Sequence, residues 1–185
     1  MSHVAASRMD SRVPRVLIVK PEKAYLGVLS RRVAESGYRI AIADTVQAAV
    51  AELYRIPVDV ILSELRATNF NGAELLGIIR RDAVLRDIPL LFFSGRADHP
   101  AAIQALRDGA DAIVKKPFHF EVLVARIGRE LQRKRAIEEL QSVNRALDAR
   151  ITERAMAMGE LRDRLASSET ERVRLEALVA ATGRR

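Results

Sequence analysis

Short apolar runs alternate with amphipathic segments along the first two thirds of the chain. Five runs are rich in β-branched or aromatic side chains, which is typical of buried strands, and they cover residues 15–19, 38–42, 58–62, 88–93 and 111–114. Apolar residues recur at helical spacing in the segments between them, which cover residues 24–35, 46–56, 73–80 and 100–107. The apolar runs lack strict alternation, so both faces of their sheet should be covered. The pattern predicts an α/β fold with a doubly wound, five-stranded parallel sheet.

From Ile137 onward the apolar residues follow a heptad repeat. Nine of the fourteen a and d positions are apolar and no Pro interrupts them, which predicts a coiled coil. Its predicted core consists of Ile137, Leu140, Asn144, Leu147, Ile151, Met158, Leu161, Leu165, Leu175 and Val179. Asn144 at an a position favours a parallel homodimer in register.

The charges beside the heptad core select a partner only weakly. Arg164 and Glu169 would attract each other across a parallel pair, whereas Glu171 and Glu176 would repel. The alternative to a coiled coil is a single amphipathic helix that folds back on the α/β domain. No helix breaker separates Leu131 from the heptads, so the last helix of the α/β domain should continue into the coil.

We therefore expect three regions: a disordered leader over 1–14, an α/β domain over 15–131 and a coiled-coil helix over 132–185. The leader mixes Ser, Arg, His and Asp without the apolar stretch of a signal peptide. No apolar run approaches the roughly 20 residues of a membrane span. Cysteine is absent, which excludes disulfides and thiolate metal sites. A cytoplasmic location is expected.

The net charge of +7 raises the question of nucleic-acid binding. Acidic and basic residues are interleaved throughout, no helix-turn-helix follows the α/β domain, and only 4% of the residues are aromatic, so nucleic acid is disfavoured as a partner. His3, His99 and His119 are scattered, and none has a second ligand at metal spacing. No metal or cofactor is expected.

Function in a doubly wound sheet sits at the carboxyl ends of the strands. In this chain that rule selects residues 20–22, 63–71, 94–96 and 115–117. The sequences around three of these clusters are VDVILSELRATNFNG (58–72), IPLLFFSG (88–95) and GADAIVKKPF (109–118).

These sequences resemble the receiver domains of bacterial response regulators in two-component signalling, over about 15–131. The resemblance implies the flavodoxin-like receiver fold. It places Lys116 at the position of the family's invariant lysine and implies a cis bond between Lys116 and Pro117. Ser94 matches the family's switch hydroxyl. Asp59 and Asp111 match positions that look structural in the family.

The chain departs from the family in three parts of the phosphorylation mechanism: the acceptor, the metal site and the switch residue. Glu64 stands where the family has the aspartate that accepts the phosphoryl group. Lys20 and Pro21, beside Glu22, replace the acidic pair that binds Mg²⁺. Ile113 replaces the aromatic that rotates when the family switches.

Phosphoryl transfer needs a well-placed carboxylate, a divalent cation and a lysine. An ammonium at Lys20 would repel Mg²⁺, and the extra methylene of Glu64 displaces the attacking oxygen. We therefore expect the domain not to be phosphorylated. Two interpretations of Glu64 remain: the site has decayed, or Glu64 pairs with Lys20, Lys116 or both and imitates a phosphorylated, charge-neutralised pocket. Without a phosphoryl group, Ser94 is interpreted as a strand-end residue that caps a turn, although it could also bond Glu64.

The expected function is that of a non-catalytic signalling or scaffold module: a pseudo-receiver that dimerises through its coil and docks protein partners that the sequence does not identify. Pseudo-receivers joined to coiled coils resemble bacterial scaffolding and polarity proteins. The alternatives are a phosphorelay response regulator that is still phosphorylated or regulated at this pocket, and a DNA-binding regulator. No nucleophile–base pair or Gly-rich phosphate loop suggests an enzyme.

Overall fold

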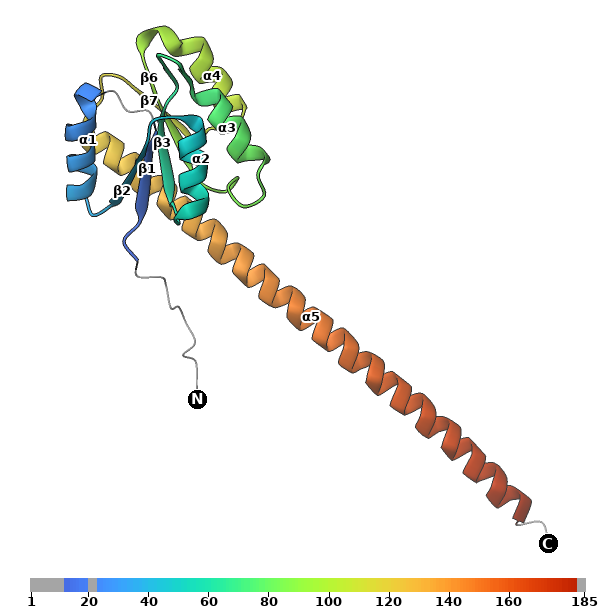
Figure 1. Cartoon of the computed structure of the whole chain (residues 1–185). Helices are drawn as coiled ribbons and strands as arrows, with labels where there is room; N and C mark the ends of the chain where they lie inside the picture. The colour runs from blue at the N-terminus through green and yellow to red at the C-terminus, as the bar shows by residue number, and fades with distance from the viewer. Residues whose placement is uncertain (1–11, 20–22, 183–185) are drawn as a thin grey trace. The chain divides into compact units, whose positions relative to one another are not determined.

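The computed structural model describes residues 12–19 and 23–182. Five parallel strands form one sheet in the order β2-β1-β3-β6-β7 (Figure 1). The strands are β1 (Arg15–Val19), β2 (Arg39–Ala43), β3 (Val60–Glu64), β6 (Leu90–Ser94) and β7 (Ala112–Lys115). The helices are α1 (Lys23–Glu35), α2 (Val46–Arg55), α3 (Gly72–Arg81), α4 (His99–Arg107) and α5 (Phe120–Thr182). The predicted doubly wound α/β fold is confirmed.

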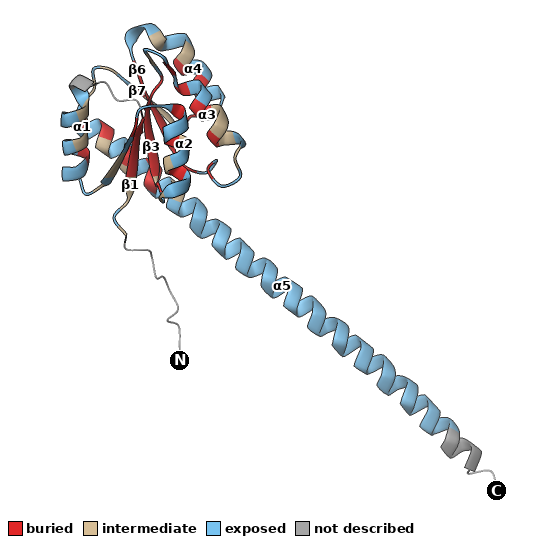
Figure 2. Ribbon diagram, viewed as in Figure 1, coloured by how far each residue is buried: buried red, intermediate tan, exposed pale blue. Residues whose placement is uncertain are grey.

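Each face of the sheet carries its own hydrophobic core. In β1, Leu17 and Val19 belong to the core beneath α2, α3 and α4, whereas Val16 and Ile18 belong to the core beneath α1 and the beginning of α5. Successive side chains of a strand point to opposite faces, so a strand buried on both faces must be apolar throughout. All five residues of β3 and of β6 are buried (Figure 2).

Strands β2, β3, β6 and β7 begin one or two residues later than the apolar pattern predicts. Two carboxylates at the amino ends of the strands explain part of this difference. The side chain of Asp59 accepts a hydrogen bond from the backbone nitrogen of Arg15 at 2.7 Å, and that of Asp111 accepts one from the backbone nitrogen of Leu90 at 2.8 Å. Asp59 and Asp111 lie just before β3 and β7, and their side chains bond the backbone of neighbouring strands. This agrees with the structural role that the resemblance suggests for them.

A helix cap and a short antiparallel pair complete the local structure around the sheet. Thr45 caps α2, because its Oγ1 accepts a hydrogen bond from the backbone nitrogen of Ala48 at 3.1 Å. The segment 66–71 contains a short antiparallel pair, β4 (Arg66–Ala67) and β5 (Phe70–Asn71). Phe70 is buried in the core, and Asn69 takes the positive φ of 55° at the turn.

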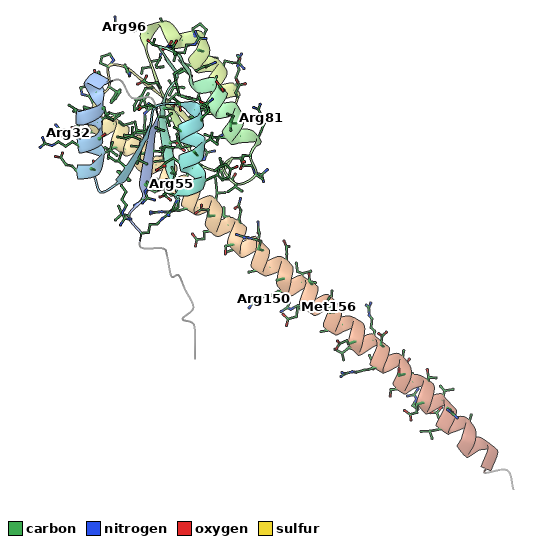
Figure 3. All side chains as sticks on the ribbon, in the orientation of Figure 1. Arg32, Arg55, Arg81, Arg96, Arg150 and Met156 are labelled. Carbon is green, nitrogen blue, oxygen red and sulfur yellow. The ribbon has the colours of Figure 1, made fainter. Side chains whose placement is uncertain are left out.

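Helix α5 contributes to two compact units, one ending at Arg135 and the other beginning at Ala136. In the first unit, Leu123, Ile127 and Leu131 of α5 pack on the sheet. In the second unit, every residue from 136 to 177 is exposed, including the apolar heptad positions. Figure 3 shows side chains extending from this stretch on all sides, with Arg150 and Met156 labelled. No helix in residues 12–19 and 23–182 combines the length and apolar character that a membrane span requires.

Arg80 on α3 joins three segments at the amino edge of the sheet. Its guanidinium donates hydrogen bonds to the carbonyl oxygens of Arg86, Ile88 and Gly109, at 2.8, 3.0 and 2.8 Å. It also donates to the carboxylate of Asp111 at 2.7 Å. Because Arg offers five donors in a rigid fork, one side chain can satisfy all four acceptors.

Replacing this guanidinium should destabilise the domain. We expect Arg80→Leu to lower the free energy of unfolding by about 2–4 kcal/mol, because Asp111 and three carbonyls lose a charged donor. Arg81→Leu, at an exposed position of the same helix, is the matched control and should have little effect. Urea unfolding followed by circular dichroism measures both. Equal unfolding midpoints for the two variants would contradict the role assigned to Arg80.

Candidate functional site

The site lies where three neighbouring strands end at the carboxyl edge of the sheet. Glu64 is the last residue of β3, Ser94 is the last of β6, and Lys116 directly follows β7. The strand register aligns Glu64 with Phe93 and Ser94 with Lys115. The backbone nitrogen of Lys116 donates to the carbonyl of Ser94 at 2.9 Å. Parallel pairing therefore brings together residues that are far apart in the sequence.

An ion pair between the buried Glu64 and the partly buried Lys116 forms the centre of the site. The Nζ of Lys116 donates to Oε1 of Glu64 at 2.7 Å, and the two side chains are 17% and 6% exposed. Charges removed from water require close compensation, and removing one partner of such a pair costs about 3–5 kcal/mol. The pairing of Glu64 with Lys116, on which the second interpretation of Glu64 depends, is thus present in the structure.

Aromatic rings flank the Lys116 ammonium. Its Nζ lies 5.7 Å from the ring centroid of Tyr25 and 5.9 Å from that of Phe93. Phe118 stacks on Phe93 with centroids 5.1 Å apart, and Tyr25 lies 6.3 Å from Phe118. The ammonium therefore has a carboxylate and ring faces as neighbours.

The remaining predicted site residues can be placed as follows. Ser94 is buried at the end of β6, and the turn after it is closed by Asp98, whose carboxylate accepts a hydrogen bond from the backbone nitrogen of Gly95 at 2.7 Å. The bond between Lys116 and Pro117 is cis, as the resemblance implies. Ile113 is half-buried and packs against the core beneath α2, α3 and α4. The predicted degenerate pocket of Lys20, Pro21 and Glu22 lies outside the described residues.

The described part of the site does not fit Mg²⁺. The ion prefers several oxygen ligands in octahedral geometry. Within residues 12–19 and 23–182, no three His, Cys, Asp or Glu side chains are grouped so that they could hold a metal. The carboxylate of Glu64 is already engaged by an ammonium.

Gly72 is a site residue that the sequence reasoning did not single out. A Cβ atom there would lie 2.5 Å from the carbonyl oxygen of Glu64 and 2.6 Å from the ring of Phe92. The backbone nitrogen of Gly72 donates to the carbonyl of Leu65 at 2.9 Å, which holds the start of α3 against the end of β3. The sequence did contain a hint of this role. A glycine as the first residue of a helix is not needed to end that helix, so it can mark a close approach of two backbone segments.

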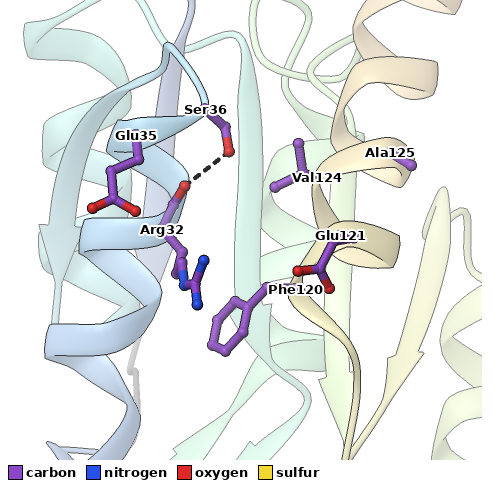
Figure 4. Close-up of a pocket in the computed structure, with 7 residues that line it drawn as sticks. All are labelled: Arg32, Glu35, Ser36, Phe120, Glu121, Val124 and Ala125. Atoms are coloured by element: carbon purple, nitrogen blue, oxygen red, sulfur yellow. Dashed lines mark hydrogen bonds between the residues drawn. The ribbon is translucent and has the colours of Figure 1, made fainter.

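A separate groove of about 430 Å³ lies between α1 and the beginning of α5 (Figure 4). Its walls include Arg32 and Glu35 from α1, and Phe120, Glu121 and Val124 from α5. None of the predicted site residues lines it. The ring of Phe120 lies edge-on to Phe118, with centroids 5.6 Å apart, so the groove and the aromatic surroundings of Lys116 are in contact.

Comparison with known proteins assigns the domain. Residues 16–128 match the family model described as the response regulator receiver domain. This match covers more than half of the 185 residues, so the chain belongs to the response regulator receiver family.

Individual relatives match about two thirds of the chain. The transcriptional regulatory protein KdpE of Mycobacterium tuberculosis is 30% identical over 126 residues, which cover 68% of this chain and 54% of KdpE. The phosphate regulon transcriptional regulatory protein PhoB of Klebsiella pneumoniae is 28% identical over 128 residues, covering 68% of this chain and 56% of PhoB. The chain thus covers about half the length of these relatives.

Solved structures show the same fold. A CheY-like receiver domain protein from Methanospirillum hungatei has a TM-score of 0.62 at 23% identity, with 68% of this chain and 98% of that chain covered. NtrX from Brucella abortus has a TM-score of 0.65 at 19% identity, with 71% and 30% covered.

Adding one methyl group at Gly72 should disturb the end of β3. We expect Gly72→Ala to lower the free energy of unfolding by about 1–3 kcal/mol, because the new Cβ meets the buried carbonyl of Glu64 and the ring of Phe92. Gly77→Ala on the same helix is the control. Its Cβ would meet only the flexible end of Arg81 at 3.4 Å, so it should be neutral or stabilise by up to about 1 kcal/mol. Thermal unfolding compares the two, and a stable Gly72→Ala would contradict the close contact.

Proposed function

We propose that this receiver domain is not phosphorylated and that its Glu64–Lys116 ion pair holds the pocket in one state. In this role the chain is a non-catalytic signalling or scaffold module that binds other proteins. The observation that carries the proposal is the 2.7 Å contact between the buried carboxylate of Glu64 and the partly buried ammonium of Lys116.

The ion pair opposes phosphorylation in two ways. Lys116 is at the position of the lysine that binds the transferred oxygens in the family, and here its ammonium is directed to a carboxylate of the chain itself. Glu64 would have to leave that ammonium to attack a phosphoryl donor, which leaves a charge uncompensated in a buried place. A negative charge held on Lys116 resembles the charge arrangement of a phosphorylated pocket, so we favour imitation of that state over decay.

The position that rotates when the family switches, occupied here by Ile113, also favours a single fixed state. Ile113 is packed against a core cluster, and its carbonyl accepts a hydrogen bond from Arg126 at 3.0 Å. An aliphatic side chain has no hydroxyl or ring edge with which to report a rotation. A pocket and an output position that are both fixed support a constitutive binding surface rather than a switch.

We further propose that the chain forms a parallel homodimer through α5. The apolar heptad residues of the second unit are exposed, among them Leu140 at 64%, Leu161 at 58% and Leu165 at 60%. An apolar stripe that occupies nine of fourteen core positions on a water-facing helix favours association. Asn144 from each chain would meet at the axis of a parallel pair, where the two amides can bond each other.

The printed names of KdpE and PhoB favour a second candidate, a role in transcription regulation. The matched region lies in the receiver domain, and the acidic and basic residues of the C-terminal stretch are interleaved. A gel-shift titration with duplex DNA at several salt concentrations would support this candidate if salt-dependent binding appears.

If the Glu64–Lys116 ion pair locks the pocket in one state (the proposed lock), a phosphoryl donor should leave the protein unmodified. After incubation with acetyl phosphate and Mg²⁺, intact-protein mass spectrometry should show no phosphoryl adduct. A receiver domain that has aspartate at the corresponding position serves as the positive control for the donor. A stoichiometric adduct on Glu64, located by fragmentation, would refute the proposal and favour the phosphorelay alternative.

The proposed dimer predicts that only one side of the helix tolerates a charge. Leu161→Glu, at a d position, should shift the protein from dimer to monomer at micromolar concentration, because it places two carboxylates in the apolar seam. Met156→Glu, at the f position and 68% exposed, is the control and should leave the dimer intact. Sedimentation equilibrium distinguishes them. A monomeric wild-type chain would refute the homodimer whatever the variants do.

A further inference from the structure

Half of the chain's aromatic side chains gather beside Lys116, although only eight residues of the 185 are aromatic. They form a continuous set in which Phe93, Tyr25 and Phe120 each contact Phe118, with centroid distances of 5.1, 6.3 and 5.6 Å. Two members of the set, Tyr25 and Phe93, present their rings to the ammonium.

The two rings differ in their surroundings. Phe93 is 3% exposed and belongs to the core beneath α1 and α5, so its position is fixed by packing. Tyr25 is 39% exposed and lies near the start of α1, at the solvent side of the ammonium's surroundings. A ring face within about 6 Å attracts a cation through its quadrupole, and the attraction strengthens where water is excluded.

We propose that Tyr25 is a positioning residue that covers Lys116 and keeps its ammonium directed at Glu64. The inference rests on the proposed function, because it concerns the same ion pair. Phe93 supports the ammonium from the core, and the face of Tyr25 restricts the approach of solutes to Nζ. The phenolic hydroxyl is not needed for this role, since the ring face carries the interaction.

A purely space-filling role for Tyr25 makes a different prediction. If the ring served only to cover apolar surface, leucine would replace it about as well as phenylalanine. If the face of the ring acts on the ammonium, phenylalanine should preserve the effect and leucine should lose it. The comparison of Tyr25→Phe with Tyr25→Leu therefore separates the two roles.

The experiment measures how fast Lys116 reacts with an amine-specific reagent. An N-hydroxysuccinimide acetate ester is added to the full-length protein, and fragment-ion mass spectrometry resolves Lys116 from its neighbour Lys115. Lys115 is exposed and serves as the internal reference in every sample. Tyr54→Leu, at an exposed tyrosine of α2 that bonds Asp82, is the control for losing a tyrosine elsewhere. Thermal unfolding confirms that each variant is folded, and Tyr25→Met gives the same comparison should the leucine variant not fold.

In the wild-type protein, Lys116 should react about tenfold more slowly than Lys115. Tyr25→Phe and Tyr54→Leu should stay within about twofold of the wild-type ratio, and Tyr25→Leu should react about three- to tenfold faster at Lys116. Equal rates for Tyr25→Leu and Tyr25→Phe would overturn the role of the ring while leaving the ion pair standing. A wild-type Lys116 that reacts as fast as Lys115 would refute the ion pair itself, and with it the proposed lock.

Discussion

The contact between Glu64 and Lys116 spans the carboxyl edge of the sheet, from β3 to the segment after β7, across the intervening β6. Two features of the surrounding structure allow this contact: the direction of the strands and the close approach of α3. The strands run parallel, so their ends meet at one edge, and the absence of a side chain at Gly72 lets α3 begin directly against the carbonyl of Glu64. The rings of Tyr25 and Phe93 lie 5.7 and 5.9 Å from the same ammonium and add a cation–π attraction to it.

The two edges of the sheet use charged residues differently. At the amino edge, the carboxylates of Asp59 and Asp111 accept hydrogen bonds from backbone nitrogens and pair with Arg12 and Arg80, at 2.9 and 2.7 Å. These partly exposed pairs join strands to the loops that precede them. At the carboxyl edge, the carboxylate of Glu64 is only 6% exposed, and the resemblance to receiver domains implies that its pair with Lys116 occupies the position of their reactive centre. Under the proposed function, the charges at this edge set the state of the pocket, whereas those at the amino edge hold the strands to the preceding segments.

The sequence allowed most of the architecture to be predicted. Each strand is an apolar run, and the segments between strands have apolar residues at helical spacing. Strand ends were less accurate, since an apolar pattern does not show that Asp59 and Asp111 bond the backbone of neighbouring strands. Glu64 and Lys116 were identified by their position in a family pattern, and their pairing was one of the options weighed. Tyr25 and Gly72 were missed because their contacts with Lys116 and with the end of β3 are made across the fold. The homodimer and the absence of phosphorylation stay predictions.

The complete exposure of residues 136–177 has a consequence for regulation by abundance. A helical stretch whose residues are all exposed gains little stability in water, and pairing with a second chain would supply the missing burial. Under the proposed pairing, the order of this segment obeys mass action and increases with the concentration of the protein. Synthesis and degradation of the chain would then set the assembled fraction.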